Sequence, residues 1–413
     1  MESNALSVQC CIVGGGPAGM MLGLLLARSG VRVVVLEKHG DFLRDFRGDT
    51  IHPSTLEVMH ELGILDRLLR LPHQEARVLR VQLGDETYPM ADFGHLPTRC
   101  RFIAFMPQWE FLDFLASEAA RHPAFALRMD ADVTELIESG GRIGGVRAST
   151  PTGPLEVRAD LVVGADGRGS LVRAQAGLSV EELGAPMDVL WFRVSRAVSD
   201  PAETMGRFEA GRIFLMICRG EHWQLGYVIA KGTLDGIRAR GLEAFRADVA
   251  RLAPFVRDRV GELRDWGDVK LLTVRVDRLR RWHRPGLLCL GDAAHAMSPV
   301  GGIGINLAIQ DAVATANLLA EPLRLGRLTD ADLARVQKRR EWPARVTQRA
   351  QVLVQDRLIA PLLVDTGTLE PPLPLRLFRR FPVLRRIPAR LVGMGVRPEH
   401  VRTTVAVPES GAR

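Results

Sequence analysis

Apolar runs and helical periodicities alternate along the chain and predict alternating strands and helices. Residues 11–13 and 31–36 are short, almost continuous apolar runs, and residues 20–28 between them have the apolar content of a packed helix. Short apolar runs bounded by turn residues are typical of buried strands. Residues 107–121 predict an amphipathic helix with Pro107 in its first turn. The pattern as a whole indicates an α/β fold.

The order of these elements predicts domains that share the chain rather than follow one another. Strands dominate residues 185–277, whereas the flanking segments alternate strands with helices. We find no internal repeat and no low-complexity linker. The predicted division is a discontinuous nucleotide-binding domain of residues 1–72, 107–180 and 278–320, a substrate-binding sheet domain of residues 77–105 and 185–277, C-terminal helices at 321–402 and a disordered tail at 403–413.

A glycine-rich turn joins the first predicted strand to the first predicted helix. Gly14, Gly16 and Gly19 have the spacing Gly-x-Gly-x-x-Gly. The first glycine permits the turn, the second lets a diphosphate approach, and the third lets helix and strand pack closely. Backbone N–H groups at the helix N-terminus then face the pyrophosphate. The acidic side chain that ends the second strand is placed to accept hydrogen bonds from the adenosine ribose. The candidate dinucleotide-binding residues here are Gly14, Gly16, Pro17, Ala18, Gly19, Glu37 and Lys38.

Two further glycine motifs follow later apolar runs and favour FAD over NAD. Gly164 to Gly167 follow one run, and Gly291-Asp292 follow another at 287–290. Asp292 is placed to accept hydrogen bonds from ribityl hydroxyls. A glycine run then leads into a long helix whose N-terminal amides direct partial positive charge at a flavin ring, which stabilises its reduced anion. The candidate cofactor residues of this region are Asp292, Gly302, Gly304, Ile305 and Asn306.

With these three motifs the chain resembles the p-hydroxybenzoate hydroxylase-like, single-component (class A) FAD-dependent aromatic monooxygenases. The resemblance covers about residues 8–319. It implies a Rossmann-like FAD-binding domain interleaved with a mostly β substrate domain and followed by a C-terminal helical segment. It also implies that Asp166 supports the diphosphate and ribityl region, that Arg47 faces the flavin and its diphosphate, and that Gln108 opens a helix beside the ribityl chain. Pro299 resembles the proline whose backbone carbonyl lies at the reactive edge of the flavin.

The resemblance implies an activity. Members of this family reduce FAD with NAD(P)H, react the reduced flavin with O2, and transfer the distal oxygen of a C4a-hydroperoxide to an electron-rich ring. A second Gly-x-Gly-x-x-Gly unit after a strand is missing, so we expect NAD(P)H to bind transiently. An FAD-dependent dehydrogenase or reductase on the same fold is the alternative, and a non-catalytic flavoprotein is a weaker one. A flavin-dependent halogenase shares the fold but usually carries a Trp-x-Trp-x-Ile-Pro stretch. It is disfavoured because no two tryptophans are two residues apart in this chain.

The sequence is less informative about catalysis and substrate. Arg47, Asp49 and Pro299 are the candidate catalytic residues, and an approach to a helix N-terminus explains Asp49 equally well. His295 is expected to be a packed structural residue. Only two tyrosines are present, so no tyrosine relay is evident and a larger, mostly apolar aromatic or polyketide-like substrate is expected. Which face of the strand pair 212–218 and 222–229 lines the pocket stays open. The candidate pocket residues are His52, Phe214, Met216, Gln224 and Tyr227.

Composition bears on partners and location. The formal net charge is +7, but the arginines are interspersed with acids, so we expect a small-molecule substrate and no nucleic acid. Apolar runs are too short to span a bilayer and no secretory signal is evident, which favours a cytoplasmic protein. The cysteines lack metal-ligand spacing, so we predict no metal site. Basic and apolar residues mix at 373–393, where they suit an anionic membrane surface or, preferably, helices that cap the flavin domain. The oligomeric state is open between monomer and homodimer.

Overall fold

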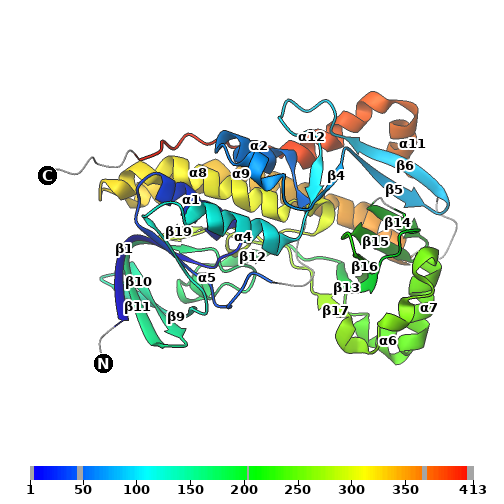
Figure 1. The fold of residues 1–413 in the computed structure, drawn as a ribbon, viewed down its shortest axis with the longest axis horizontal. Coiled ribbons are helices and arrows are strands. Elements are labelled where there is room, and N and C mark those ends of the chain that lie inside the picture. The colour runs from blue at the N-terminus through cyan, green and yellow to red at the C-terminus, as the bar shows by residue number, and fades with distance from the viewer. Residues whose placement is uncertain (1–3, 44–49, 202–203, 365–369, 407–413) are drawn as a thin grey trace.

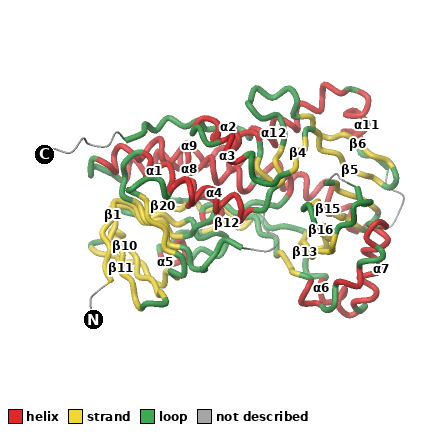
Figure 2. The backbone as a smooth tube through the Cα atoms, in the orientation of Figure 1, coloured by secondary structure: helices red, strands yellow, loops and turns green. Residues whose placement is uncertain are grey.

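The computed structural model describes residues 4–43, 50–201, 204–364 and 370–406. Two large sheets lie at opposite ends of the molecule, and long helices run between and above them (Figures 1 and 2). The first sheet lies at the end that holds the N-terminus, and the second lies among the C-terminal helices. The functional site is built where elements of the two ends meet.

The first sheet has eight strands and contains the predicted nucleotide-binding elements. Its central strands run in the order β19-β20-β11-β1-β2-β8, with β10 and β9 continuing antiparallel from β11. β1 pairs in parallel with β11 and β2, and β11 pairs in parallel with β20. The carboxyl ends of these strands therefore meet at one edge. The bounds are β1 Asn4–Val13, β2 Val33–Leu36, β8 Phe125–Arg128, β9 Asp132–Ser139, β10 Arg142–Thr150, β11 Gly153–Gly164, β19 His283–Arg284 and β20 Leu287–Cys289.

Four long helices cover this sheet. α1 begins with Pro17 at its first position, directly after the glycine turn, and its residues from 18 to 27 are buried. It packs against α4 and α8, and α8 packs against α9. The expectation that every apolar run is too short to span a bilayer is wrong for Val300–Arg324, which is long and apolar enough to do so, but 78% of its most apolar window is buried inside the protein. It is therefore used here as a core helix. The bounds are α1 Pro17–Arg28, α4 Gln108–Ala119, α8 Gly304–Arg324 and α9 Asp330–Val354.

The second sheet has seven strands in the order β17-β13-β16-β15-β14-β5-β6. Most pairs are antiparallel, and β14 pairs in parallel with β5, which comes from much earlier in the chain. One face packs against α6 and α7 and forms an aromatic-rich core. The other face lines a cavity together with the three glycine motifs. The bounds are β5 Val78–Leu83, β6 Glu86–Asp92, β13 Met187–Ser195, β14 Met205–Glu209, β15 Arg212–Cys218, β16 His222–Ala230, β17 Lys270–Leu272, α6 Leu234–Ala239 and α7 Leu242–Leu252.

Smaller elements connect the two sheets. A three-stranded sheet of order β3-β7-β4 and a two-stranded pair of β12 and β18 lie between them. The C-terminal helices α11 and α12 pack on β6 of the second sheet, so these two helices cap the second sheet, and the expectation that they cap the nucleotide-binding domain is wrong for them. The bounds are β3 Thr50–Ile51, β4 Gln74–Ala76, β7 Ile103–Phe105, β12 Val180–Glu182, β18 Asp277–Leu279, α2 Pro53–Glu61, α3 Leu65–Leu68, α5 Leu171–Gln175, α10 Ala360–Val364, α11 Leu373–Arg380 and α12 Arg386–Met394, with short 3-10 turns at Pro254–Val256, Val260–Glu262, Trp266–Asp268, Gly291–Ala293, Val300–Gly302 and Pro382–Arg385 and a π-helical turn at Gln355–Ile359.

The predicted disordered tail begins too early. The Arg28 side chain donates a hydrogen bond to the carbonyl of Thr403 at 3.1 Å, and the Ala406 N–H donates to the Arg28 carbonyl at 2.9 Å. These contacts hold residues 403–406 against the end of α1, so the prediction of disorder from 403 is wrong for them. Residues 407–413 lie outside the described part of the chain.

Candidate active site

A cavity of about 850 Å³ joins the carboxyl edge of the first sheet to the inner face of the second. Its polar end is made by the three glycine motifs, and its other end is made by apolar side chains of β5, β14 and β15. Most of the predicted cofactor residues therefore surround one space. Those that line it are Gly14, Gly16, Pro17, Ala18, Glu37, Lys38, Gln108, Asp166, Asp292, Gly302, Gly304 and Ile305, together with Pro299.

The first glycine turn has the geometry that its sequence predicts. Gly14 has φ +104°, and a Cβ there would lie 2.5 Å from the carbonyl oxygen of Ala165. A Cβ on Gly19 would overlap the carbonyl oxygen of Gly14. Both glycines are therefore required by backbone packing, as predicted. A Cβ on Gly16 would meet nothing within 4 Å, so that position opens onto the cavity. Glu37 steadies the turn because its Oε2 accepts a hydrogen bond of 2.9 Å from the Gly15 N–H.

The third motif lies opposite this turn. Asp292 follows β20 in a single helical turn, and its carboxylate is about one-third exposed, 3.5 Å from Nε of Arg168. Gly301 and Gly302 both have positive φ, +79° and +62°. A Cβ on Gly302 would overlap the Thr50 hydroxyl, which donates a 3.0 Å hydrogen bond to the Gly302 carbonyl. This close approach brings β3 to the start of α8, where Gly304 and Ile305 line the cavity.

Comparison with known proteins identifies the family of this site. Residues 7–350 match the family described as FAD binding domain. The chain belongs to this FAD-dependent family. It is 35% identical over 353 residues to 6-methylpretetramide 4-monooxygenase of Streptomyces rimosus, covering 84% of each chain. The monooxygenase is thus an FAD-dependent oxidoreductase, and the resemblance inferred from its motifs is confirmed.

Solved structures share the fold of the monooxygenase. Anhydrotetracycline hydroxylase OxyS of Streptomyces rimosus superposes with a TM-score of 0.75 at 24% identity, over 95% of this chain and 77% of that one. PqsL of Pseudomonas aeruginosa, a probable FAD-dependent monooxygenase, superposes with a TM-score of 0.73 at 22% identity, over 87% of this chain and 98% of that one. At these identities the likeness shows the α/β fold, which agrees with the predicted fold class.

The polar end of the cavity fits FAD. The space beside Gly16 is open enough for a diphosphate, because a Cβ built there meets no atom within 4 Å. Carboxylates at the ends of two parallel strands, Glu37 and Asp292, offer acceptors to two sets of sugar or ribityl hydroxyls. The first turn of α8 directs its N–H groups into the cavity. Among the described residues no group of three or more His, Cys, Asp or Glu side chains is arranged to hold a metal ion.

Three of the predicted pocket residues lie on the face of the second sheet that points away from the cavity. Phe214, Met216 and Tyr227 belong to the core between the sheet and α7, and the rings of Phe214 and Tyr227 contact each other with centroids 6.1 Å apart. Their prediction as pocket residues is wrong, because strand alternation turns them away from the cavity. Gln224, on the other face of β16, lines the cavity. The apolar residues that replace the three are Ile213, Leu215, Ile217 and Val228.

Two predicted residues support the site from behind. Asn306 is 3% exposed, and its Oδ1 accepts hydrogen bonds of 2.8 Å from the His52 N–H and the Thr55 hydroxyl. Its Nδ2 donates to the carbonyls of Thr50 and Gly302. The side-chain amide is therefore fully used in tying β3 and α2 to α8, so a cofactor contact of Asn306 stays a prediction for its backbone N–H in the first turn of α8. His52 is completely buried and does not line the cavity, so its prediction as a pocket residue is also wrong.

Asp166 lines the cavity and also accepts hydrogen bonds from the start of α5. Its Oδ1 accepts a 2.6 Å hydrogen bond from the Ser170 hydroxyl, and its Oδ2 accepts one of 3.1 Å from the Val172 N–H at the start of α5. Burial raises the pKa of the Asp166 carboxyl, and these hydrogen bonds partly oppose the rise. Arg47 and Asp49, the remaining predicted catalytic residues, lie outside the described residues.

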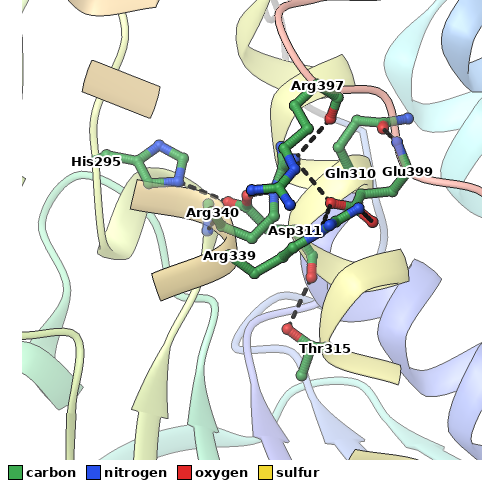
Figure 3. A network of polar contacts seen from close by, with 9 residues as sticks. His295, Gln310, Asp311, Thr315, Arg339, Arg340, Arg397 and Glu399 are labelled. Atoms are coloured by element: carbon green, nitrogen blue, oxygen red, sulfur yellow. Dashed lines mark hydrogen bonds and ion pairs between the residues drawn. The ribbon is translucent and has the colours of Figure 1, made fainter. Parts of the chain in front are cut away.

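A buried ionic network behind the third motif was not predicted (Figure 3). Asp311 on α8 lies 2.6 Å from Nε2 of His295 and 2.9 Å from Nε of Arg340 on α9. Arg340 also contacts Glu399 at 3.3 Å, and Asp311 accepts a 3.3 Å hydrogen bond from the Gly291 N–H. Burial opposes ionisation of Asp311, but His295 and Arg340 outweigh it and lower its pKa. The network therefore fixes the turn that carries Asp292 to two helices and the C-terminal segment.

The buried His52 predicts a pH dependence of stability. Burial lowers the pKa of His52 from 6.5 to about 4, opposed by the hydrogen bond from its Nδ1 to the Val392 carbonyl. The folded protein then binds a proton less readily than the unfolded chain. The contribution of the neutral His52 to the free energy of unfolding should thus be complete above pH 6.5. The free energy of unfolding should then fall by up to about 3 kcal/mol as the pH decreases toward 4.

Urea denaturation at several pH values between 7 and 4 measures this slope. The matched variant is His52→Gln, whose amide also donates to a carbonyl but does not titrate. We expect the variant to lose less stability than the native protein over this range. Parallel slopes for the two proteins would contradict the assignment of the pH dependence to His52.

Proposed function

We propose that this FAD-dependent monooxygenase hydroxylates an aromatic, polyketide-like molecule with NAD(P)H and O2 as co-substrates. The observation that carries the proposal is the apolar arm of the cavity, which continues directly from the glycine motifs. Its walls come from three sources, β5, β15 and the C-terminal helix α11, and include Leu79, Val81, Ile213, Leu215, Leu375 and Phe378. Related proteins named for 6-methylpretetramide and anhydrotetracycline support an extended, ring-bearing substrate.

FAD, when bound, supplies the transfer of reducing equivalents from NAD(P)H to O2. We assign its diphosphate to the turn at Gly16, Pro17 and Ala18, its ribose to Glu37 and Lys38, and its ribityl chain to Asp292 and Gln108. The first turn of α8, from Gly304, would then offer backbone N–H groups to the ring, where they would favour negative charge. Arg47 and Asp49, which lie outside the described residues, remain candidate catalytic residues.

The apolar arm also protects the reaction from water. The side chains of Trp191, Met205 and Ile217 line it, and apolar walls hold little ordered water because they offer few hydrogen-bond partners. Exclusion of water favours oxygen transfer over unproductive loss of the activated oxygen. Pro299 lines the same cavity before α8, so its carbonyl is our candidate for handling the oxygen at the reacting edge.

Asp292→Ala should weaken FAD binding by about 10- to 100-fold, because a charged hydrogen-bond acceptor for the ribityl chain is removed. Fluorescence titration of the apoprotein with FAD measures the change. Asp292→Asn, which keeps an acceptor oxygen, is the matched control and should lose less. A folded Asp292→Ala protein that purifies yellow with unaltered FAD affinity would show that the ribityl chain lies elsewhere.

Gln224→Leu should raise the KM for the aromatic substrate by up to about tenfold, since a neutral hydrogen bond is lost. The polar side chain of Gln224 extends from the second sheet and lines the cavity. Its Oε1 accepts a 3.1 Å hydrogen bond from Nε of Arg219. The slow NAD(P)H oxidation without substrate should not change. The control is Gln82→Leu, on the same sheet but outside the cavity lining. Equal effects of the two substitutions would show that Gln224 does not bind the substrate.

Anaerobic stopped-flow reduction by NADPH and NADH, with and without a panel of phenols and anthracene-like polyketides, tests the function. Acceleration by a ring compound, followed by incorporation of one atom of 18O2 into that compound, is the expected result. Reduction without incorporation of oxygen would favour the FAD-dependent dehydrogenase. We also propose that the enzyme is a monomer or a homodimer. We propose that it works in the cytoplasm and binds no nucleic acid.

A further inference from the structure

The positive charge of this protein is concentrated in one C-terminal segment. Residues 371–398 contain seven arginines and no lysine, aspartate or glutamate, and the formal net charge of the whole chain is also +7. Opposite charges therefore balance over the rest of the chain. The arginines of the segment are Arg376, Arg379, Arg380, Arg385, Arg386, Arg390 and Arg397.

The same segment exposes large apolar side chains. Leu373 and Leu377 are spaced four residues apart on α11, and Ile387 and Leu391 have the same spacing on α12, so each pair shares one helix face. Leu373 is 65% exposed and Ile387 is 60% exposed. The full exposed set is Leu373, Leu377, Phe381, Val383, Ile387 and Leu391. We call these residues and the arginines among them the α11–α12 face.

This face is separate from the surface by which the two helices pack on the protein. The inward side of α11 carries Leu375 and Phe378, which line the cavity. The inward side of α12 carries Ala389 and Met394, which belong to a core cluster with Phe93 and others. The exposed apolar residues are thus not needed to close the core. Figure 1 shows α11 at the upper right edge of the molecule and α12 leading from it toward the middle, both away from the N- and C-terminal ends.

We propose that the α11–α12 face docks the enzyme onto an anionic membrane surface. Amphipathic helices that combine Leu, Phe and Ile with arginines bind at the boundary between headgroups and acyl chains. Apolar burial and attraction to anionic headgroups provide two separate contributions, and stable peripheral binding needs both. This inference concerns where the enzyme works and goes beyond the proposed function. Because α11 also lines the cavity, the docked face places a wall of the substrate site beside the lipid.

Vesicle flotation tests the proposal with the full-length FAD-bound protein. Wild type should float with vesicles of phosphatidylglycerol and phosphatidylcholine, should not float with phosphatidylcholine alone, and should be released by high salt. Arg376 and Arg379 form ion pairs with Glu370 and Glu86, so we choose three other arginines for neutralisation. Changing Arg380, Arg386 and Arg390 together to Gln should weaken partitioning by about 100-fold.

A second variant tests the apolar contribution. Ile387→Ser with Leu391→Ser should also lose binding to the anionic vesicles, whereas Leu271→Ser with Leu325→Ser, two similarly exposed leucines elsewhere, should bind as wild type. NADPH-dependent flavin reduction should be equal in all variants. Failure of wild type to float, or equal flotation of the two serine variants, would overturn the proposal. A dimer of wild type that the α11–α12 substitutions dissociate, without flotation, would also overturn it by assigning the face to a second copy.

Discussion

Replacing Arg340 by methionine should lower the free energy of unfolding by about 3–5 kcal/mol, because it breaks a buried ion pair and leaves the fully buried Asp311 without its arginine partner. Arg340 is 1% exposed and contacts Asp311 and Glu399, which are 0% and 4% exposed. Methionine fills much of the same volume but offers no hydrogen-bond donor. The turn at Gly291, whose N–H also reaches Asp311, should loosen, so FAD affinity should fall as well. Urea denaturation of the apoprotein and the holoprotein measures both effects.

A matched arginine on the same helix provides the control. Arg335 is 62% exposed and pairs with Asp332 three residues earlier, so Arg335→Met should change stability little. Combining Arg340→Met with Asp311→Asn should recover part of the loss, since the buried side chain that lost its arginine partner is then neutral. Equal stability of Arg340→Met and Arg335→Met would contradict a stabilising role for the buried pair.

The sequence was informative where a requirement is local. Gly14 and Gly19 are demanded by backbone atoms of the turn and of the adjoining strand, so their spacing alone predicts the turn. The apolar runs of β1 and β2 predict a pair of buried parallel strands, and Glu37 follows at the end of β2. These features are set by neighbours in sequence or by one strand pairing, which is why motif and periodicity reveal them.

The remaining features depend on distant pairing. β16 is buried on both faces from Trp223 to Ile229, so hydrophobic alternation cannot distinguish the cavity face from the core face. The candidate pocket residues therefore come from both faces: Gln224 lines the cavity, whereas Phe214 and Tyr227 lie in the core. The network of Asp311, Arg340 and Glu399 joins residues 29 to 59 positions apart with no shared periodicity. Only the packing of α8 against α9 and the C-terminal segment brings these charges together.

Gly14→Ala and Gly16→Ala should separate two roles of the first glycine turn. Gly14→Ala places a Cβ 2.5 Å from the Ala165 oxygen at φ +104°, where backbone atoms cannot yield, so it should destabilise even the apoprotein by roughly 2–5 kcal/mol. At Gly16 the backbone has φ −71° and the added Cβ meets nothing within 4 Å. Gly16→Ala should therefore fold normally as the apoprotein.

The difference should reappear in FAD binding. In Gly16→Ala the new methyl group occupies the space that we assign to the diphosphate, so FAD affinity should fall by at least about tenfold while apoprotein stability stays unchanged. Gly144→Ala, another position with open surroundings and no positive φ, controls for a general effect of the added methyl group. FAD titration and urea denaturation of the three apoproteins measure both quantities. Native FAD affinity in Gly16→Ala would show that the diphosphate does not bind at this turn, because the substitution changes only the space beside Gly16.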